Sequence, residues 1–72
     1  MDKNEIKKEL YKQNPIAELG FTTEVSKTYS TEIIVDGEDV IVEFEVPFSD
    51  MGETVFEDKI EAKYLIRWIT ID

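Results

Sequence analysis

The stretch from Tyr29 to Phe48 places the strongest constraint on the fold. Two runs of β-branched and aromatic residues flank the pair Asp36-Gly37, which is typical of a two-residue turn between antiparallel strands. From Val40 to Val46 every second residue is apolar, so one side of the second run is suited to burial. The sequence therefore predicts a β-hairpin with one buried face.

The length of the turn sets which residues of the hairpin lie opposite each other. A two-residue turn closes Val35 on Glu38. A four-residue loop over 36–39 would instead set Glu32 opposite Glu43, and like charges in that position cost up to about 1 kcal/mol. We therefore predict the two-residue turn.

A helix is predicted before the hairpin, over residues 2–13. Asp2 is a suitable N-cap, and Glu5 follows three residues later as in a capping box. Pro15 ends the helix because the residue before a proline is displaced from the α conformation. The apolar stripe of this helix is narrow, so the helix needs a sheet to dock on, and the alternative is a mobile charged tail.

Three strands are predicted between this helix and residue 47. Residues 16–25 alternate between apolar and polar, and Gly20 within them marks a bulge or a close backbone approach. Residues 28–35 form the second strand. The third strand ends at Pro47, or lies at a sheet edge, because proline cannot donate a ladder hydrogen bond.

The C-terminal segment has two interpretations. Thr54 and Glu57 have the spacing of a capping box, which predicts a second helix from Val55 to about Trp68. Acids come first and bases last along this segment, as the helix dipole favours. The run YLIRWITI, residues 64–71, is rich in aromatic and β-branched residues and also fits a strand. The helix is the favoured interpretation.

These elements predict one α+β domain over residues 1–72, with the order α-β-β-β-α. In this fold a three-stranded antiparallel meander is packed on one face by two helices. The predicted core consists of Ile6, Leu10, Leu19, Phe21, Ile33, Val40, Val42, Phe44, Phe56, Ile60 and Trp68. A chain of this length buries only about 60% of its unfolded surface, and no cysteine or histidine is present to add a disulfide or a zinc site.

The charge of the chain is strongly negative and unevenly distributed. The chain has seventeen acidic and eight basic residues, which gives a net charge of −9. Between Lys27 and Lys59 there are ten acids and no base. The negative electrostatic potential of these acids should repel nucleic acid and anionic membranes and attract basic surfaces.

The residue types present argue against several classes of function. Without histidine or cysteine the chain lacks the commonest general base and the best nucleophile, so we expect no enzymatic activity and no cofactor. The acidic turns at 36–39 and 50–53 do not have the spacing of a calcium-binding loop, so no metal site is predicted. No apolar run is long enough to cross a membrane, and the N-terminus has no secretory signal, so we expect a cytoplasmic protein.

Acidic side chains near the hairpin are the candidate contact surface for a partner. Alternation places Glu43 and Glu45 on one side of the third strand, about 6.7 Å apart. The predicted partner-binding acidic residues are Glu32, Asp39, Glu43, Glu45, Asp50 and Glu53. Two interpretations remain: these acids bind a basic groove on another protein, or they provide solubility and prevent association between sheet edges.

In its size, its acidity, its lack of cysteine and histidine and its helix–meander–helix order, the chain resembles the small accessory proteins encoded by phages and prophages of Gram-positive bacteria. That resemblance implies a non-enzymatic module that binds a host protein. One alternative is an acidic inhibitor that imitates nucleic acid and blocks a DNA- or RNA-binding enzyme. A second alternative is a structural subunit that associates with copies of itself.

Overall fold

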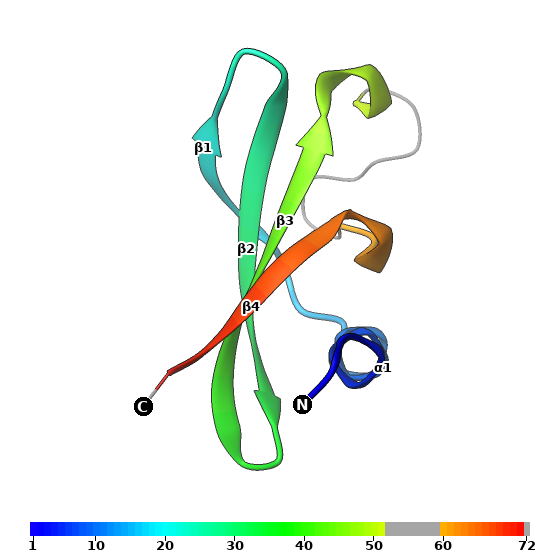
Figure 1. Cartoon of the computed structure of the whole chain (residues 1–72), viewed down its shortest axis with the longest axis vertical. Coiled ribbons are helices and arrows are strands. Elements are labelled where there is room, and N and C mark those ends of the chain that lie inside the picture. The colour runs from blue at the N-terminus through cyan, green and yellow to red at the C-terminus, as the bar shows by residue number, and fades with distance from the viewer. Residues whose placement is uncertain (52–59, 72) are drawn as a thin grey trace.

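The computed structural model describes residues 1–51 and 60–71 (Figure 1). Its elements in chain order are α1 (Lys3–Gln13), β1 (Glu18–Thr22), β2 (Ser26–Val35), β3 (Glu38–Pro47), two 3₁₀ turns (Phe48–Asp50 and Ala62–Tyr64) and β4 (Leu65–Ile71). The strands form one antiparallel sheet in the order β1-β2-β3-β4. The α+β class is consistent with this arrangement. The predicted three-stranded meander with two helices is wrong, because the described residues form one α-helix and four strands.

The β2–β3 hairpin has the predicted register. Val35 pairs with Glu38 across a two-residue turn. Asp36 and Gly37, the two turn residues, have φ angles of 52° and 80°. The type I′ hairpin turn needs positive φ at both central positions, and aspartate and glycine tolerate that conformation better than most residues. As predicted, β3 ends at Pro47.

Helix α1 begins and ends where the sequence predicts. The Asp2 carboxylate accepts a hydrogen bond from the Glu5 N–H at 2.9 Å and so caps the first turn. At the other end Asn14 adopts the left-handed conformation with a φ of 47°, and its N–H donates to the Leu10 carbonyl. Both ends of the helix are therefore set by local side-chain and backbone chemistry.

Strand β4 replaces the last part of the predicted second helix. Residues 65–68 of that helix lie in β4, and its predicted start at Thr54 and Val55 lies outside the described residues. The segment is dense in β-branched residues, which lose side-chain freedom in a helix and suit a strand. Pairing from Leu65 with Phe44 to Ile71 with Asp39 also gives β3 a hydrogen-bonded neighbour on its second side.

Strand β1 is shorter and more exposed than the predicted strand over 16–25. The pairing between β1 and β2 shifts between Leu19 and Phe21, so Gly20 does mark a bulge. A side chain at Gly20 would place its Cβ 3.2 Å from the Thr28 carbonyl oxygen. Beyond the bulge Phe21 pairs with Thr28 and lies on the face away from the core. Leu19 and Phe21 are 56% and 57% exposed, so their assignment to the core is wrong.

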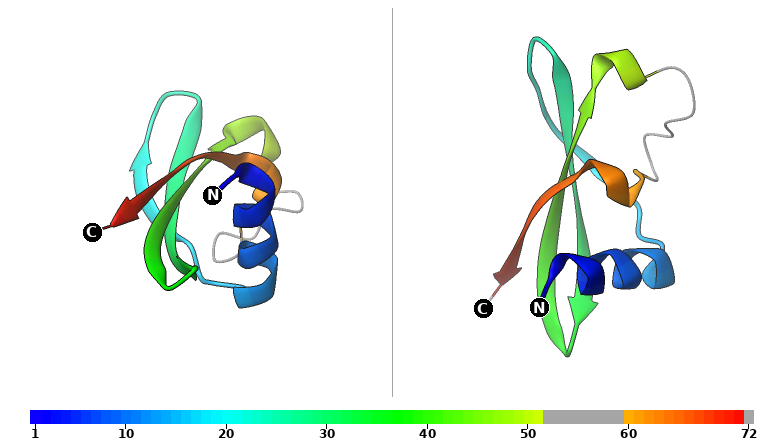
Figure 2. Two further views of the ribbon diagram at one scale, coloured as in Figure 1. Left: turned by 60° about the horizontal axis from the view of Figure 1, so that its bottom comes forward. Right: turned by 45° about the vertical axis from the view of Figure 1, so that its right-hand side comes forward.

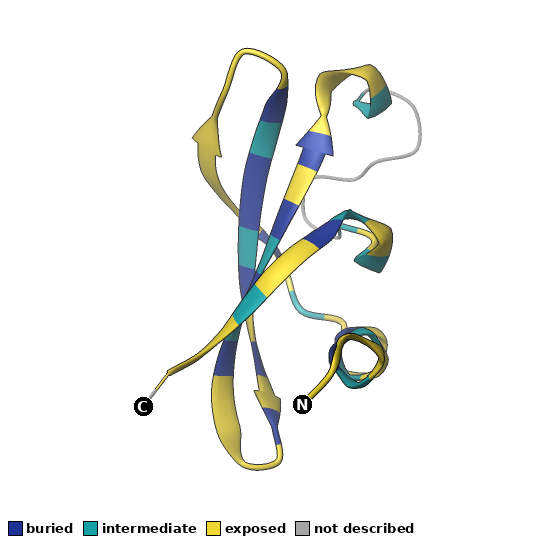
Figure 3. Ribbon diagram, viewed as in Figure 1, coloured by how far each residue is buried: buried dark blue, intermediate teal, exposed yellow. Residues whose placement is uncertain are grey.

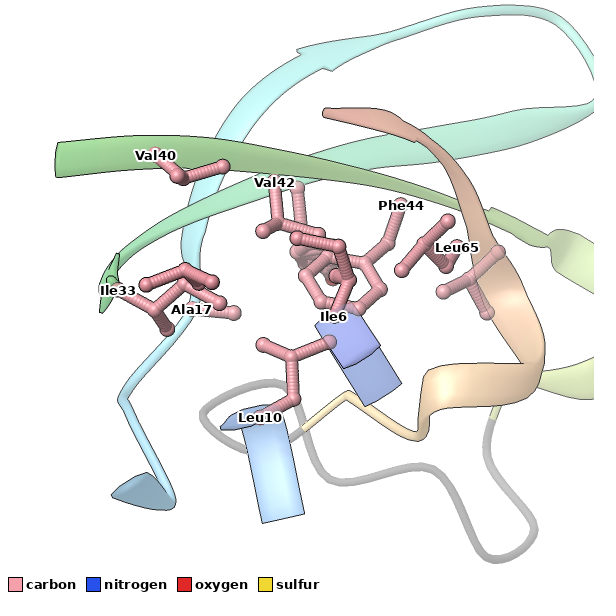
Figure 4. Close-up of a cluster of buried hydrophobic side chains, with 11 residues drawn as sticks. Ile6, Leu10, Ala17, Ile33, Val40, Val42, Phe44 and Leu65 are labelled. Atoms are coloured by element: carbon pink, nitrogen blue, oxygen red, sulfur yellow. The ribbon is translucent and has the colours of Figure 1, made fainter. Parts of the chain in front are cut away.

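The core lies between α1 and one face of the sheet. Figure 2 shows α1 on one side of the β2–β3 hairpin, and Figure 3 shows buried residues alternating with intermediate or exposed ones along most of both strands. Figure 4 shows Ile6 and Leu10 of α1 beside the side chains of the sheet. The buried apolar residues are Ile6, Leu10, Ala17, Tyr29, Ile33, Val35, Val40, Val42, Phe44, Val46 and Leu65.

Most of the predicted core is therefore confirmed. Ile60 and Trp68 are partly buried and pack against this cluster, although Trp68 reaches it from a strand rather than from a helix. Phe56 lies outside the described residues.

Candidate functional site

The face of the sheet opposite α1 is the candidate site. No described helix lies on it, and most of its side chains are exposed. We call it the open face. By strand pairing its members are Glu18 and Phe21 of β1, Thr28, Ser30, Glu32 and Ile34 of β2, Asp39, Ile41, Glu43 and Glu45 of β3, and Arg67, Ile69 and Ile71 of β4.

Four of the six acids predicted from the sequence lie on the open face. They are Glu32, Asp39, Glu43 and Glu45, and the hairpin register places them there because they fall on the strand positions that alternate with the core residues. Glu18 adds a fifth carboxylate, since it pairs with Ser30 on the neighbouring strand. Sequence reasoning did not select Glu18, because its position depends on the register between β1 and β2.

The other two predicted acids do not join this group. Asp50 lies in the 3₁₀ turn after β3, and its Oδ2 accepts a hydrogen bond from the Tyr64 hydroxyl at 2.8 Å. This hydrogen bond raises the pKa of Tyr64, because it stabilises the protonated phenol, and desolvation and the charge of Asp50 act in the same direction. Glu53 lies outside the described residues.

Among the described residues, one base lies on the open face, and it is paired. The Arg67 Nη2 atom lies 2.9 Å from Glu43 Oε2 and donates a hydrogen bond to it across β3 and β4. This hydrogen bond and the charge of Glu43 raise the pKa of Arg67. The sequence had placed Arg67 among the bases near the end of the predicted second helix. In the strand it instead neutralises one of the five carboxylates.

Isoleucine side chains lie among these acids. Ile41 pairs with Glu32 on one side and with Ile69 on the other, so an apolar contact spans β3 and β4. In the next row Asp39 lies between Ile34 and Ile71. Ile34, Ile69 and Ile71 are 56%, 51% and 42% exposed. The acidic face is therefore also partly apolar, a property that the predicted helix over 55–68 had concealed.

A hollow of about 400 Å³ lies where β1 is too short to cover β2. It is lined by Pro15, Ile16, Glu18, Ser30, Thr31, Glu32 and Ile41. The Thr31 hydroxyl donates a hydrogen bond to the Ile16 carbonyl at 3.0 Å and holds the chain before β1 against β2. The hollow thus combines two carboxylates with apolar walls.

The described residues contain no group of three or more acidic side chains positioned to hold a metal ion. Within the same residues, no helix is long and apolar enough to cross a membrane. Comparisons with protein-family models, with curated proteins and with solved structures found no match to this chain.

Proposed function

We propose that this protein is a non-enzymatic binding module that attaches through its open face to a basic surface of another protein. The observation that carries the proposal is the charge of that face. Within residues 1–51 and 60–71 it has five carboxylates and a single base, Arg67, already paired with Glu43. Such a face attracts a cationic partner and repels an anionic one. The resemblance to small phage and prophage proteins supports a host protein in the cytoplasm as the partner.

A second candidate is an inhibitor that imitates nucleic acid, supported by acids repeated along neighbouring strands. Glu43 and Glu45 are separated by about 6.7 Å along β3, and Glu32 and Asp39 extend the acidic surface across the hairpin. Isoleucines interrupt this array, however, and apolar side chains suit a protein interface better than an imitation of a phosphate backbone. The general protein-binding proposal therefore comes first.

The test uses charge reversal at residues whose removal breaks no described ion pair. Glu32→Lys with Asp39→Lys changes the open face, whereas reversal of Glu43 would also break its contact with Arg67. The matched control is Glu24→Lys with Glu38→Lys, which changes the net charge equally. Glu24 lies between β1 and β2, and Glu38 lies on the strand positions that face the core side.

The measurement is capture from host lysate, followed by titration of the purified partner at several salt concentrations. We expect the open-face variant to lose the partner, the control variant to keep it, and affinity to fall as salt increases. Equal binding by both variants would contradict the proposal. Displacement of DNA or RNA from the captured partner would support the second candidate, and a concentration-dependent mass in sedimentation would support self-association instead.

A further inference from the structure

We infer that the hollow receives a single arginine or lysine side chain of the partner, whose neighbouring apolar side chains cover Ile41 and Ile69. This inference rests on the proposed function and adds the chemistry of the segment that binds. It follows from the two kinds of surface that meet in the hollow: carboxylates at Glu18 and Glu32, and apolar walls.

The carboxylates are placed to hold one cation between them. Glu18 pairs with Ser30, and Glu32 lies two residues further along β2. Their Cα atoms are thus diagonal neighbours, about 7–8 Å apart in an antiparallel sheet, within the reach of both long side chains. Among the described residues no base forms an ion pair with either of them. A guanidinium group presents donors on several sides and can bind both carboxylates.

The walls suit the aliphatic part of such a side chain. Pro15, Ile16 and Ile41 line the hollow, and Ile16 is 68% exposed. Lysine and arginine side chains favour sites where the methylene groups lie on apolar surface while the charged end reaches polar groups. The hydrogen bond from Thr31 to the Ile16 carbonyl holds this wall in place before any partner binds.

The apolar surface continues from the hollow toward β4. Ile41 lines the hollow and pairs with Ile69, so two strand spacings, about 10 Å, separate β2 from Ile69. Seven residues of an α-helix cover a similar distance, at about 1.5 Å each. A helix with arginine at one position and leucines four and seven positions later can therefore fill the hollow and cover both isoleucines.

A second copy of this chain is a poor occupant of the same face. Each copy has a net charge of −9 and would bring five further carboxylates to the contact. Like charges brought together in an interface oppose association. Charge complementarity therefore selects a cationic segment of another protein.

The test is a titration of the ¹⁵N-labelled protein with a designed helical peptide, followed by NMR. The peptide carries one arginine with leucines four and seven positions later, and a matched peptide replaces the arginine by citrulline, which has nearly the same shape without the charge. We expect shifts at Glu18, Glu32, Ile41 and Ile69, and about tenfold weaker binding of the citrulline peptide. That factor is typical for one charge-assisted contact.

Two double variants separate the hollow from the rest of the open face. Glu18→Gln with Glu32→Gln removes both carboxylates of the hollow, whereas Asp39→Asn with Glu45→Gln removes as much charge from the same face outside it. All four side chains are exposed, so both proteins should fold. We expect about tenfold weaker binding of the arginine peptide by the first variant and less than twofold by the second.

Three other results of the peptide titration would contradict the inference. Equal loss of peptide affinity in the two double variants would overturn the inference about the hollow and leave binding by the whole acidic face intact. Peptide binding that ignores all four substitutions would contradict the proposed function as well. A second copy that covers the face would also overturn the inference. It would be shown by a dimeric mass in sedimentation and by the loss of the peptide-induced shifts at high protein concentration.

Discussion

The carboxamide of Gln13 pairs with the backbone of Ile34 through two hydrogen bonds. The amide Nε2 atom donates to the Ile34 carbonyl at 2.7 Å, and Oε1 accepts from the Ile34 N–H at 3.1 Å. The carbonyl and the N–H of Ile34 belong to the part of β2 beyond Ser30, where the pairing with β1 has ended. The side chain thus takes the place of a neighbouring strand and blocks an edge that could otherwise pair with another chain.

The first prediction concerns this contact. Gln13→Ala should lower the free energy of unfolding by about 1 kcal/mol, because two hydrogen bonds to this partly solvated edge are lost, together with an exposed one to Glu9 Oε2. It should also accelerate amide hydrogen exchange at Ile34. Lys8→Ala, on an exposed position of the same helix, is the control. Unchanged exchange at Ile34 in the Gln13 variant would show that the contact does not protect this edge.

The second prediction compares two phenylalanines that the sequence assigned to the same core. Phe44 is 1% exposed and Phe21 is 57% exposed. Phe44→Ala should lower the free energy of unfolding by about 3–5 kcal/mol, which is enough to unfold a large fraction of the molecules of a domain of this size. Phe21→Ala should lower it by less than about 1 kcal/mol. Urea denaturation followed by circular dichroism measures both. A similar cost for the two substitutions would contradict the position of the bulge in β1.

The parts of the fold that the sequence revealed depend on local chemistry. The hairpin register follows from the turn pair Asp36-Gly37 and from strict alternation, and the ends of α1 follow from Asp2 and Pro15. The same alternation placed Glu43 and Glu45 together on one side of the third strand, where the hairpin register has them. These features need no knowledge of which distant segments meet.

The parts that were missed depend on distant pairing. Residues 65–71 suit a helix or a strand, and the choice is decided by their pairing with β3, which brings Arg67 to Glu43, 24 positions earlier in the sequence. Likewise, Gly20 indicated a bulge, but which face Phe21 takes depends on its pairing with Thr28. The hollow and Glu18 were missed for the same reason.

The third prediction concerns the turn. A Cβ atom added at Gly37 would meet nothing within 4 Å, so any cost of substitution arises from its positive φ of 80°. Gly37→Ala should therefore lower the free energy of unfolding by about 1–2 kcal/mol. Asp36→Asn, which also tolerates positive φ, should have little effect. Thermal denaturation of the two variants tests this, and an unchanged melting temperature in Gly37→Ala would contradict the turn geometry.

The fourth prediction concerns the hydrogen bond between Tyr64 and Asp50, which links the two 3₁₀ turns. Because the hydrogen bond to Asp50 raises the pKa of Tyr64 above the ordinary value of 10.0, the protonated phenol is favoured in the folded protein. The contribution of this hydrogen bond to stability is therefore complete below pH 10, the pKa of the tyrosine in the unfolded chain. It is lost as pH rises through the raised pKa of the folded protein. Asp50→Asn removes the charge of the acceptor and should lower the pKa of Tyr64. Titration of ¹³Cζ-labelled tyrosine by NMR, with Tyr64→Phe to assign the resonance, measures the shift. Identical titration of Tyr64 in the wild type and in Asp50→Asn would show that the carboxylate does not hold the phenol, and the connection between the two turns would then need another explanation.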